Sequence, residues 1–178
     1  MDAYLLDTNV IRYWFDGDAG TFPTVKAVAD ACAADSPLYA SAITVGEIEF
    51  GHALNPPGAG TKRDEFTAFV RGNLPQILQV SKHTAEPYGR IRATLTNKFP
   101  PRGGWPRNGK KRAEQLYDPV AARELGIDEN DLWIVAQAVE RNLVLVTSDK
   151  MARVRAAVSD VFSQFRVEDW AKSPNRAK

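Results

Sequence analysis

The sequence is poor in the residues that carry most redox and soft-metal chemistry. Its 178 residues include one cysteine, Cys32, and two histidines, His52 and His83. A single cysteine excludes an internal disulfide and a cysteine zinc site, and a reducing cytoplasm is the compartment that fits best. Two separated histidines exclude a histidine-rich metal site, and neither lies in a nucleophile motif. We therefore expect Cys32 to be a small core residue.

Long apolar runs and a strong net charge are also missing. No apolar run approaches the roughly 18 residues of a membrane span. The start, MDAYLLDTNVI, has acids at Asp2 and Asp7 and no cationic segment, so it does not resemble a signal peptide. The formal net charge is +1, so binding to nucleic acid would need a local basic patch. We expect a cytoplasmic protein with no membrane contact.

Hydrophobic residues make up 44% of the chain and charged residues 25%, the balance of an ordinary globular protein. The length suits one domain, which we place at 1–171, with a frayed tail at 172–178. Short apolar runs predict strands, and they alternate with stretches of helical pattern. This alternation predicts a parallel α/β sheet with helices on both faces. The expected strands are 3–6, 38–40, 77–80, 143–147 and 165–167. Two of the expected helices begin directly after 7–9 and 148–149. The others cover 25–34, 44–54, 62–72, 84–98 and 128–141.

One segment departs from this alternation. Residues 99–126 are rich in proline and glycine, and we expect an insertion or long loop that ends in a short helix. A run of cations reaches into it before the first acid, Glu114, with one tryptophan, Trp105, inside. Such a strip would hold RNA phosphates and stack on a base, or it is only a solvated loop. The residues of this basic strip are Lys98, Arg102, Trp105, Arg107, Lys110, Lys111 and Arg112.

Four carboxylates stand where acids are costly. Asp7 follows the first apolar run, and Asp149 follows the run at 143–147. Both would lie at the carboxyl edge of a parallel sheet, where ligands bind in such folds. Glu47 shares a helical stripe with Ile43, Phe50 and Leu54, and Asp131 shares one with Ile134, Val135 and Ala138.

Each acid also has a structural explanation. Asp7 and Asp149 are good helix caps, and Asp131 can form a capping arrangement with Asp128. Glu47 can extend to solvent or pair with an arginine. If the four converge, however, their mutual repulsion requires a cation. Ligands that are all oxygen suit Mg²⁺ or Mn²⁺.

Three motifs occur in order along the chain: LLDTNVI, AITVGEIEFG and NDLWIVAQAVERNLVLVTSD. Together with a closing FRVEDW they resemble the PIN-domain ribonucleases, in particular VapC-type toxins of toxin–antitoxin pairs. The resemblance implies a Rossmann-like sheet and metal-dependent cleavage of single-stranded RNA. It also implies an antitoxin partner and a homodimer. It places Asp7, Glu47, Asp131 and Asp149 in an acidic pocket, with Thr8, Asn9 and Ser148 beside them. The basic segment 99–126 is longer than the usual connection there.

For RNA hydrolysis we expect Asp7 and Asp149 as direct metal ligands, with Asp131 completing the shell directly or through water. Glu47 would hold a water or a second ion, or act as general base. Two other functions stay open. One is a catalytically weak PIN module that binds RNA or protein. The other is a haloacid-dehalogenase-like phosphatase, which needs a second acid where this chain has Asn9.

Overall fold

The structure is a computed structural model that describes residues 2–17, 22–54, 60–74, 76–105, 107, 112–149 and 151–172, with only the backbone of Thr61. The chain divides into two compact units. The first unit comprises 1–80, 143–149 and 166–178, and the second unit comprises 81–142 and 150–165. No helix in the described part of the chain is long and apolar enough to cross a membrane.

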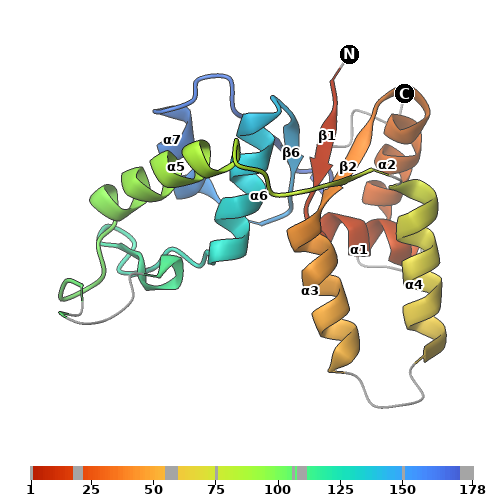
Figure 1. Cartoon of the computed structure of the whole chain (residues 1–178), viewed down its shortest axis with the longest axis horizontal. Helices are drawn as coiled ribbons and strands as arrows, with labels where there is room; N and C mark the ends of the chain where they lie inside the picture. The colour runs from red at the N-terminus through yellow and green to blue at the C-terminus, as the bar shows by residue number, and fades with distance from the viewer. Residues whose placement is uncertain are drawn as a thin grey trace. The chain divides into compact units, whose positions relative to one another are not determined.

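A five-stranded parallel sheet forms the centre of the first unit, in the order β3-β2-β1-β6-β7 (Figure 1). The expected parallel sheet is confirmed. The strands are β1 (Tyr4–Leu6), β2 (Leu38–Ser41), β3 (Ile77–Leu78), β6 (Val144–Val146) and β7 (Arg166–Glu168). Both β1 and β6 are buried along their whole length, as expected for central strands of a parallel sheet. Leu6 pairs with Val146, so these two strands end at the same edge.

Four helices belong to the first unit: α1 (Thr8–Asp16), α2 (Pro23–Asp35), α3 (Ala42–Ala53) and α4 (Gly60–Asn73). Helix α1 buries Val10, Ile11 and Trp14. The indole Nε1 of Trp14 donates to the Asp30 carboxylate at 2.8 Å, so this tryptophan is a core residue with its polar atom satisfied. Cys32 packs partly buried against the same core.

Helix α3 differs from the prediction in two ways. Its N-cap is Ser41, whose Oγ accepts from the Ile43 N–H, so the helix begins at Ala42 and not at the expected residue 44. The stripe that we assigned to the core is also wrong, because Phe50 and Leu54 are 66% and 70% exposed. The helix buries Thr44 and Ile48 instead. A helix that is apolar on most of its surface gives several equivalent stripes, and only tertiary packing selects one.

The second unit contains α5 (Ala85–Lys98), α6 (Glu129–Glu140) and α7 (Ala152–Ser159). Helices α5 and α6 are joined by the stacked rings of Tyr88 and Trp133, whose centroids are 3.7 Å apart.

The predicted loop over 99–126 is only partly correct. It contains a 3-10 helix at Ala113–Gln115 and an antiparallel hairpin of β4 (Tyr117–Asp118) and β5 (Arg123–Glu124). Strands of two residues are too short to show an alternating pattern, so no periodicity predicts them.

Candidate functional site

The site is centred on Asp7, at the point where β1 ends and α1 begins. Its backbone N–H donates to the Val146 carbonyl of β6 at 3.0 Å, so it continues the strand pairing by one residue. Its side chain is the N-cap of α1 and accepts from the Thr8 N–H at 2.7 Å. Only 5% of Asp7 is exposed. The sheet and the helix start together therefore fix a buried carboxylate at the carboxyl edge.

Neutral side chains donate further hydrogen bonds to this carboxylate. The Thr147 hydroxyl donates to Asp7 Oδ2 at 2.7 Å, and Asn9 Nδ2 donates to the same oxygen at 3.3 Å. The Ser148 N–H donates to Asn9 Oδ1 at 3.3 Å. These bonds tie the start of α1 to the residues that follow β6. They also place Thr8, Asn9 and Ser148 next to the acid, where the resemblance put them.

Thr147 is the residue that the sequence analysis missed. It is 1% exposed, and its Oγ1 also accepts from the backbone N–H of Asp149 at 3.1 Å. One hydroxyl thus orients Asp7 and fixes the turn that carries Asp149. The available signal was a threonine that closes the apolar run Leu143–Val146 directly before Ser148, because a buried hydroxyl requires a partner.

The pKa of Asp7 is raised to about 6, because burial and the negative charges of Asp149 and Glu47 raise it by more than the hydrogen bonds from Thr147 and Thr8 lower it. Desolvation is the largest of these effects. Two of the other predicted acids, Asp149 and Glu47, therefore lie close enough to Asp7 to act on its pKa. Among the residues that the structure describes, no cation shifts this pKa.

Glu47 and Asp149 approach Asp7 from different elements. Glu47 lies on α3, half-buried, and its Oε2 accepts from the Thr8 hydroxyl at 2.5 Å. Asp149 is exposed after β6. Thr8 therefore links α3 to α1 at the site, its N–H on Asp7 and its hydroxyl on Glu47.

Asp131 belongs to the second unit, and there it has the structural role described above as an alternative. Its Oδ2 accepts from the Asp128 N–H and its N–H donates to Asp128 Oδ1, both at 2.9 Å. This capping box begins α6. The other members of the helical stripe that contains Asp131, which are Ile134, Val135 and Ala138, are buried as expected.

The side chains here that could ligate a divalent cation are Asp7 and its two anionic neighbours, and they offer only oxygens. A buried carboxylate with two anionic neighbours gains stability from a bound ion. Within the described ranges, no group of three or more His, Cys, Asp or Glu is disposed to hold a metal ion. The donor chemistry therefore fits a hard cation, and a three-carboxylate cage is not assembled among these residues.

The basic strip is partly engaged within the second unit. Lys98 forms an ion pair with Asp160, and the Arg102 guanidinium lies 5.9 Å from the centre of the Tyr117 ring. Arg107 and Arg112 are exposed, and Trp105 is half-buried. The predicted residues Lys110 and Lys111 lie outside the described part of the chain.

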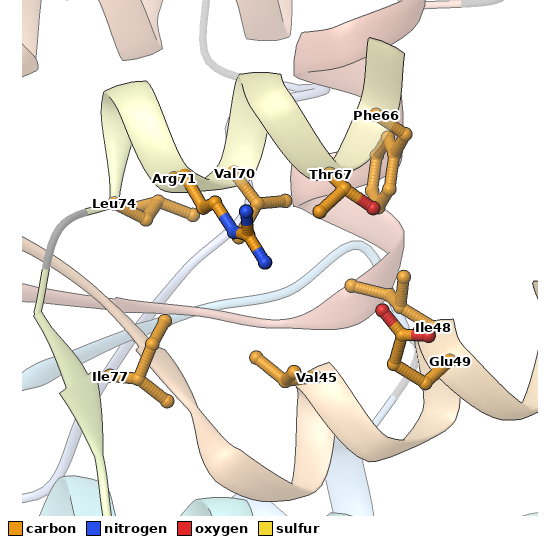
Figure 2. A pocket seen from close by; sticks show the side chains of 9 residues that line it. All are labelled: Val45, Ile48, Glu49, Phe66, Thr67, Val70, Arg71, Leu74 and Ile77. Carbon is orange, nitrogen blue, oxygen red and sulfur yellow. The ribbon is translucent and has the colours of Figure 1, made fainter. Parts of the chain in front are cut away.

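A groove separates α3 from α4 in the first unit, with a volume of about 340 Å³. Figure 2 shows that side chains of the two helices point toward one another across it. Its walls are mostly apolar, with Ile77 of β3 at one end, and its polar members are Glu49, Thr67 and Arg71. Glu49 is held by Arg63 at 2.8 Å. One wall of the groove is α3, the helix that carries Glu47. Asp7, Glu47 and Asp149 do not line the groove.

Comparisons with known proteins identify the family and the fold of the chain. The PIN domain family model matches residues 4–157. No curated protein matches the chain.

Several solved structures share the fold. A chain of VapBC2 from Rickettsia felis, bound to a DNA fragment from its promoter, has a TM-score of 0.63 at 19% identity, and the match covers 94% of this chain and 98% of that chain. A chain of FitAcB from Neisseria gonorrhoeae has a TM-score of 0.61 at 24% identity, and the match covers 96% of this chain and 99% of that chain. A chain of VapBC-1 from nontypeable Haemophilus influenzae has a TM-score of 0.60 at 21% identity, and the match covers 96% of this chain and 99% of that chain. The protein therefore belongs to the PIN domain family, and its fold is that of chains in VapBC and FitA–FitB toxin–antitoxin complexes.

Proposed function

We propose that this protein is a divalent-metal-dependent endoribonuclease that cleaves single-stranded RNA and is the toxin of a toxin–antitoxin pair. The observation that carries the proposal is the environment of Asp7. A carboxylate that is 5% exposed, raised in pKa by its burial and by two neighbouring acids, and oriented by neutral donors is an expensive arrangement without a cation. Membership of the PIN family favours a nuclease over the phosphatase that the sequence left open.

In this proposal Asp7 and Asp149 hold the ion, which supplies an activated water and neutralises charge on the phosphate. The chain's own residues prepare the site. Thr147 and Asn9 hold Asp7 in one orientation, and Thr8 holds Glu47. Glu47, with a carboxylate oxygen on Thr8, is the candidate general base.

The role of Asp131 as a metal ligand stays a prediction from the resemblance to PIN-domain ribonucleases. Its capping role means that loss of its charge affects both helix stability and any metal site. Asp131→Asn keeps a side-chain oxygen that can accept from the Asp128 N–H at this position of the capping box. A loss of cleavage in this variant at an unchanged melting temperature would therefore support a metal role.

The test is cleavage of a panel of single-stranded RNAs in Mg²⁺, in Mn²⁺ and in EDTA. Wild type should cut in the two metals and not in EDTA, and Asp7→Asn should cut in none while it remains folded. Asp64→Asn is the matched control, because Asp64 is exposed on α4. Cleavage by Asp7→Asn at the wild-type rate would contradict the proposed ligand set. RNA binding without cleavage in any metal would favour the catalytically weak module instead.

The proposed partner is a cognate antitoxin, supported by neighbours that are complexes of this kind. We place its binding segment in the groove between α3 and α4. An amphipathic segment would bury apolar side chains against Val45 and Val70 and direct an acid to Arg71. A binding partner here would contact the helix that carries Glu47, and so could affect the acidic site.

Co-purification with the product of a small neighbouring gene tests this assignment. Val70→Glu should abolish co-purification, whereas Ala68→Glu, an exposed position on the same helix outside the groove, should not. Equal retention of the partner by both variants would place the interface elsewhere. The mass of the purified protein in solution tests the predicted homodimer.

A further inference from the structure

The hairpin of the second unit forms a pocket that the proposed chemistry does not use. The pocket lies between β4–β5 and the start of α7 and has a volume of about 160 Å³. Pockets for whole small molecules are typically roughly 300–1,000 Å³, so this one suits a single planar ring system. The lining residues from the start of α7 include Met151, which follows Asp149 by two residues in the sequence.

The pocket has a fixed floor. Asp118 is 4% exposed, and its Oδ1 accepts from the N–H groups of Val120 and Ala121 at 2.9 and 3.2 Å. Its Oδ2 accepts from Arg153 Nε at 2.6 Å. The Leu125 N–H donates to the Leu116 carbonyl at 2.9 Å and closes the hairpin. Both oxygens of Asp118 are therefore occupied by the protein itself, and the hairpin is held against α7.

The remaining walls combine apolar faces with polar edges. Leu125, Met151 and Val154 supply apolar surface, while Glu124 and Arg123 are exposed at the rim. The Glu124 side chain forms no hydrogen bond or ion pair within the described part of the chain. A flat ligand with apolar faces and N–H donors on its edge matches this lining, and a nucleobase has this form.

The charge of the second unit favours a nucleic acid as the source of that base. Residues 81–142 and 150–165 contain 14 lysines and arginines against 9 aspartates and glutamates, a formal charge of +5. The first unit contains 9 against 13, a charge of −4. Since phosphates are attracted to cations, RNA would be held mainly by the second unit.

We propose that this pocket binds one unstacked guanine of the RNA substrate and so sets the sequence preference of cleavage. The two oxygens of Glu124 accept from the guanine N1–H and N2–H groups, a bidentate arrangement that no other base offers on its Watson–Crick edge. Leu125 and Met151 contact the faces of the base. Arg123 contacts an adjoining phosphate. The inference rests on the proposed function, because it takes single-stranded RNA as the substrate.

The experiment measures binding separately from cleavage. Fluorescence anisotropy in EDTA compares a uridine octamer with the same octamer carrying one guanosine, and with one carrying inosine, which lacks the N2 amino group. Wild type should bind the guanosine octamer at least about fivefold more tightly than the uridine octamer, the lower end of the discrimination expected from a bidentate pair. Inosine should fall between the two.

Glu124→Gln places an amide donor against the guanine donors and should reduce the guanosine preference to below twofold. Glu114→Gln removes the same charge from an exposed position of the second unit outside the pocket, and should keep the full preference. Cleavage of the same octamers in Mg²⁺ distinguishes the two proposals. Cleavage without guanosine preference, or a preference that survives in Glu124→Gln, overturns the pocket assignment alone. Absence of both binding and cleavage overturns the proposed function, and the pocket assignment with it.

Discussion

Removal of the Asp7 charge should stabilise the metal-free protein, and the gain should depend on pH. The pKa of Asp7 is raised from 3.8 to about 6 in the folded state. The folded protein therefore binds this proton more tightly than the unfolded chain, and the free energy of unfolding falls as pH rises from about 4 through about 6. A shift of about two units corresponds to about 3 kcal/mol at neutral pH.

Asp7→Asn lacks this titration and has nearly the same shape. Its side-chain oxygen can still cap α1 or accept from Thr147, but one amide cannot serve as two acceptors. We therefore expect a gain of about 1–3 kcal/mol at pH 7.5 and almost none at pH 4. For a chain of this length, each kcal/mol raises the melting temperature by about 2–4 °C.

The assay is urea unfolding of wild type and Asp7→Asn in EDTA at pH 4, 5, 6 and 7.5. Asp64→Asn serves as a control for the loss of an exposed charge. The difference between Asp7→Asn and wild type should grow with pH and level off above about pH 7. If the variant is equally or less stable at pH 7.5, Asp7 is not a strained carboxylate, and the argument for a cation at this site fails.

Three further predictions concern Asp149, Thr147 and the basic strip. Asp149→Asn should raise the melting temperature in EDTA, and millimolar Mg²⁺ or Mn²⁺ should stabilise wild type far more than this variant; identical melting of both proteins in all conditions would show that the acids are independent caps. Thr147→Val removes the hydroxyl donor to Asp7 at nearly constant shape, and should cost about 1.5–3 kcal/mol at pH 7.5 in urea unfolding and less at pH 4; an equal cost at both values would mean that the hydroxyl has only a packing role. Neutralising Lys110, Lys111 and Arg112 should reduce the slope of log K against log salt by about 0.7 per lost phosphate contact, and an unchanged slope would show a solvated loop.

The sequence predicted the sheet because its strands are short apolar runs separated by clear helix signals. The runs before Asp7 and Asp149 needed no structural information to place both acids at one edge. The pattern did not determine which face of α3 is buried. Phe50 and Leu54 are exposed although they share a helical stripe with Glu47, since burial depends on what α3 packs against and not on periodicity alone.

The hairpin and the buried threonine escaped prediction for different reasons. The two strands of the hairpin are two residues each and are held by a side chain, Asp118, whose three hydrogen bonds are made on folding. Thr147 looks like an ordinary strand residue in the sequence. Its role follows from partners that come from α1 and from the turn after β6, and those contacts exist only in the folded chain.

In the part of the chain that the structure describes, every hydrogen-bond donor to the Asp7 carboxylate is neutral. Thr8, Asn9 and Thr147 orient the carboxylate without cancelling its charge. An arginine in the same place would also satisfy the oxygens, but it would neutralise the acid and remove the attraction for a second cation. Neutral donors instead leave the negative charge in place, at a cost that burial and two more acids increase. A site whose purpose was only to cap α1 would not need this cost, because an exposed aspartate or a serine caps a helix about as well. A carboxylate that is buried, held by neutral donors of the described residues and close to two more acids is therefore the feature that favours a cation-binding site over a set of helix caps.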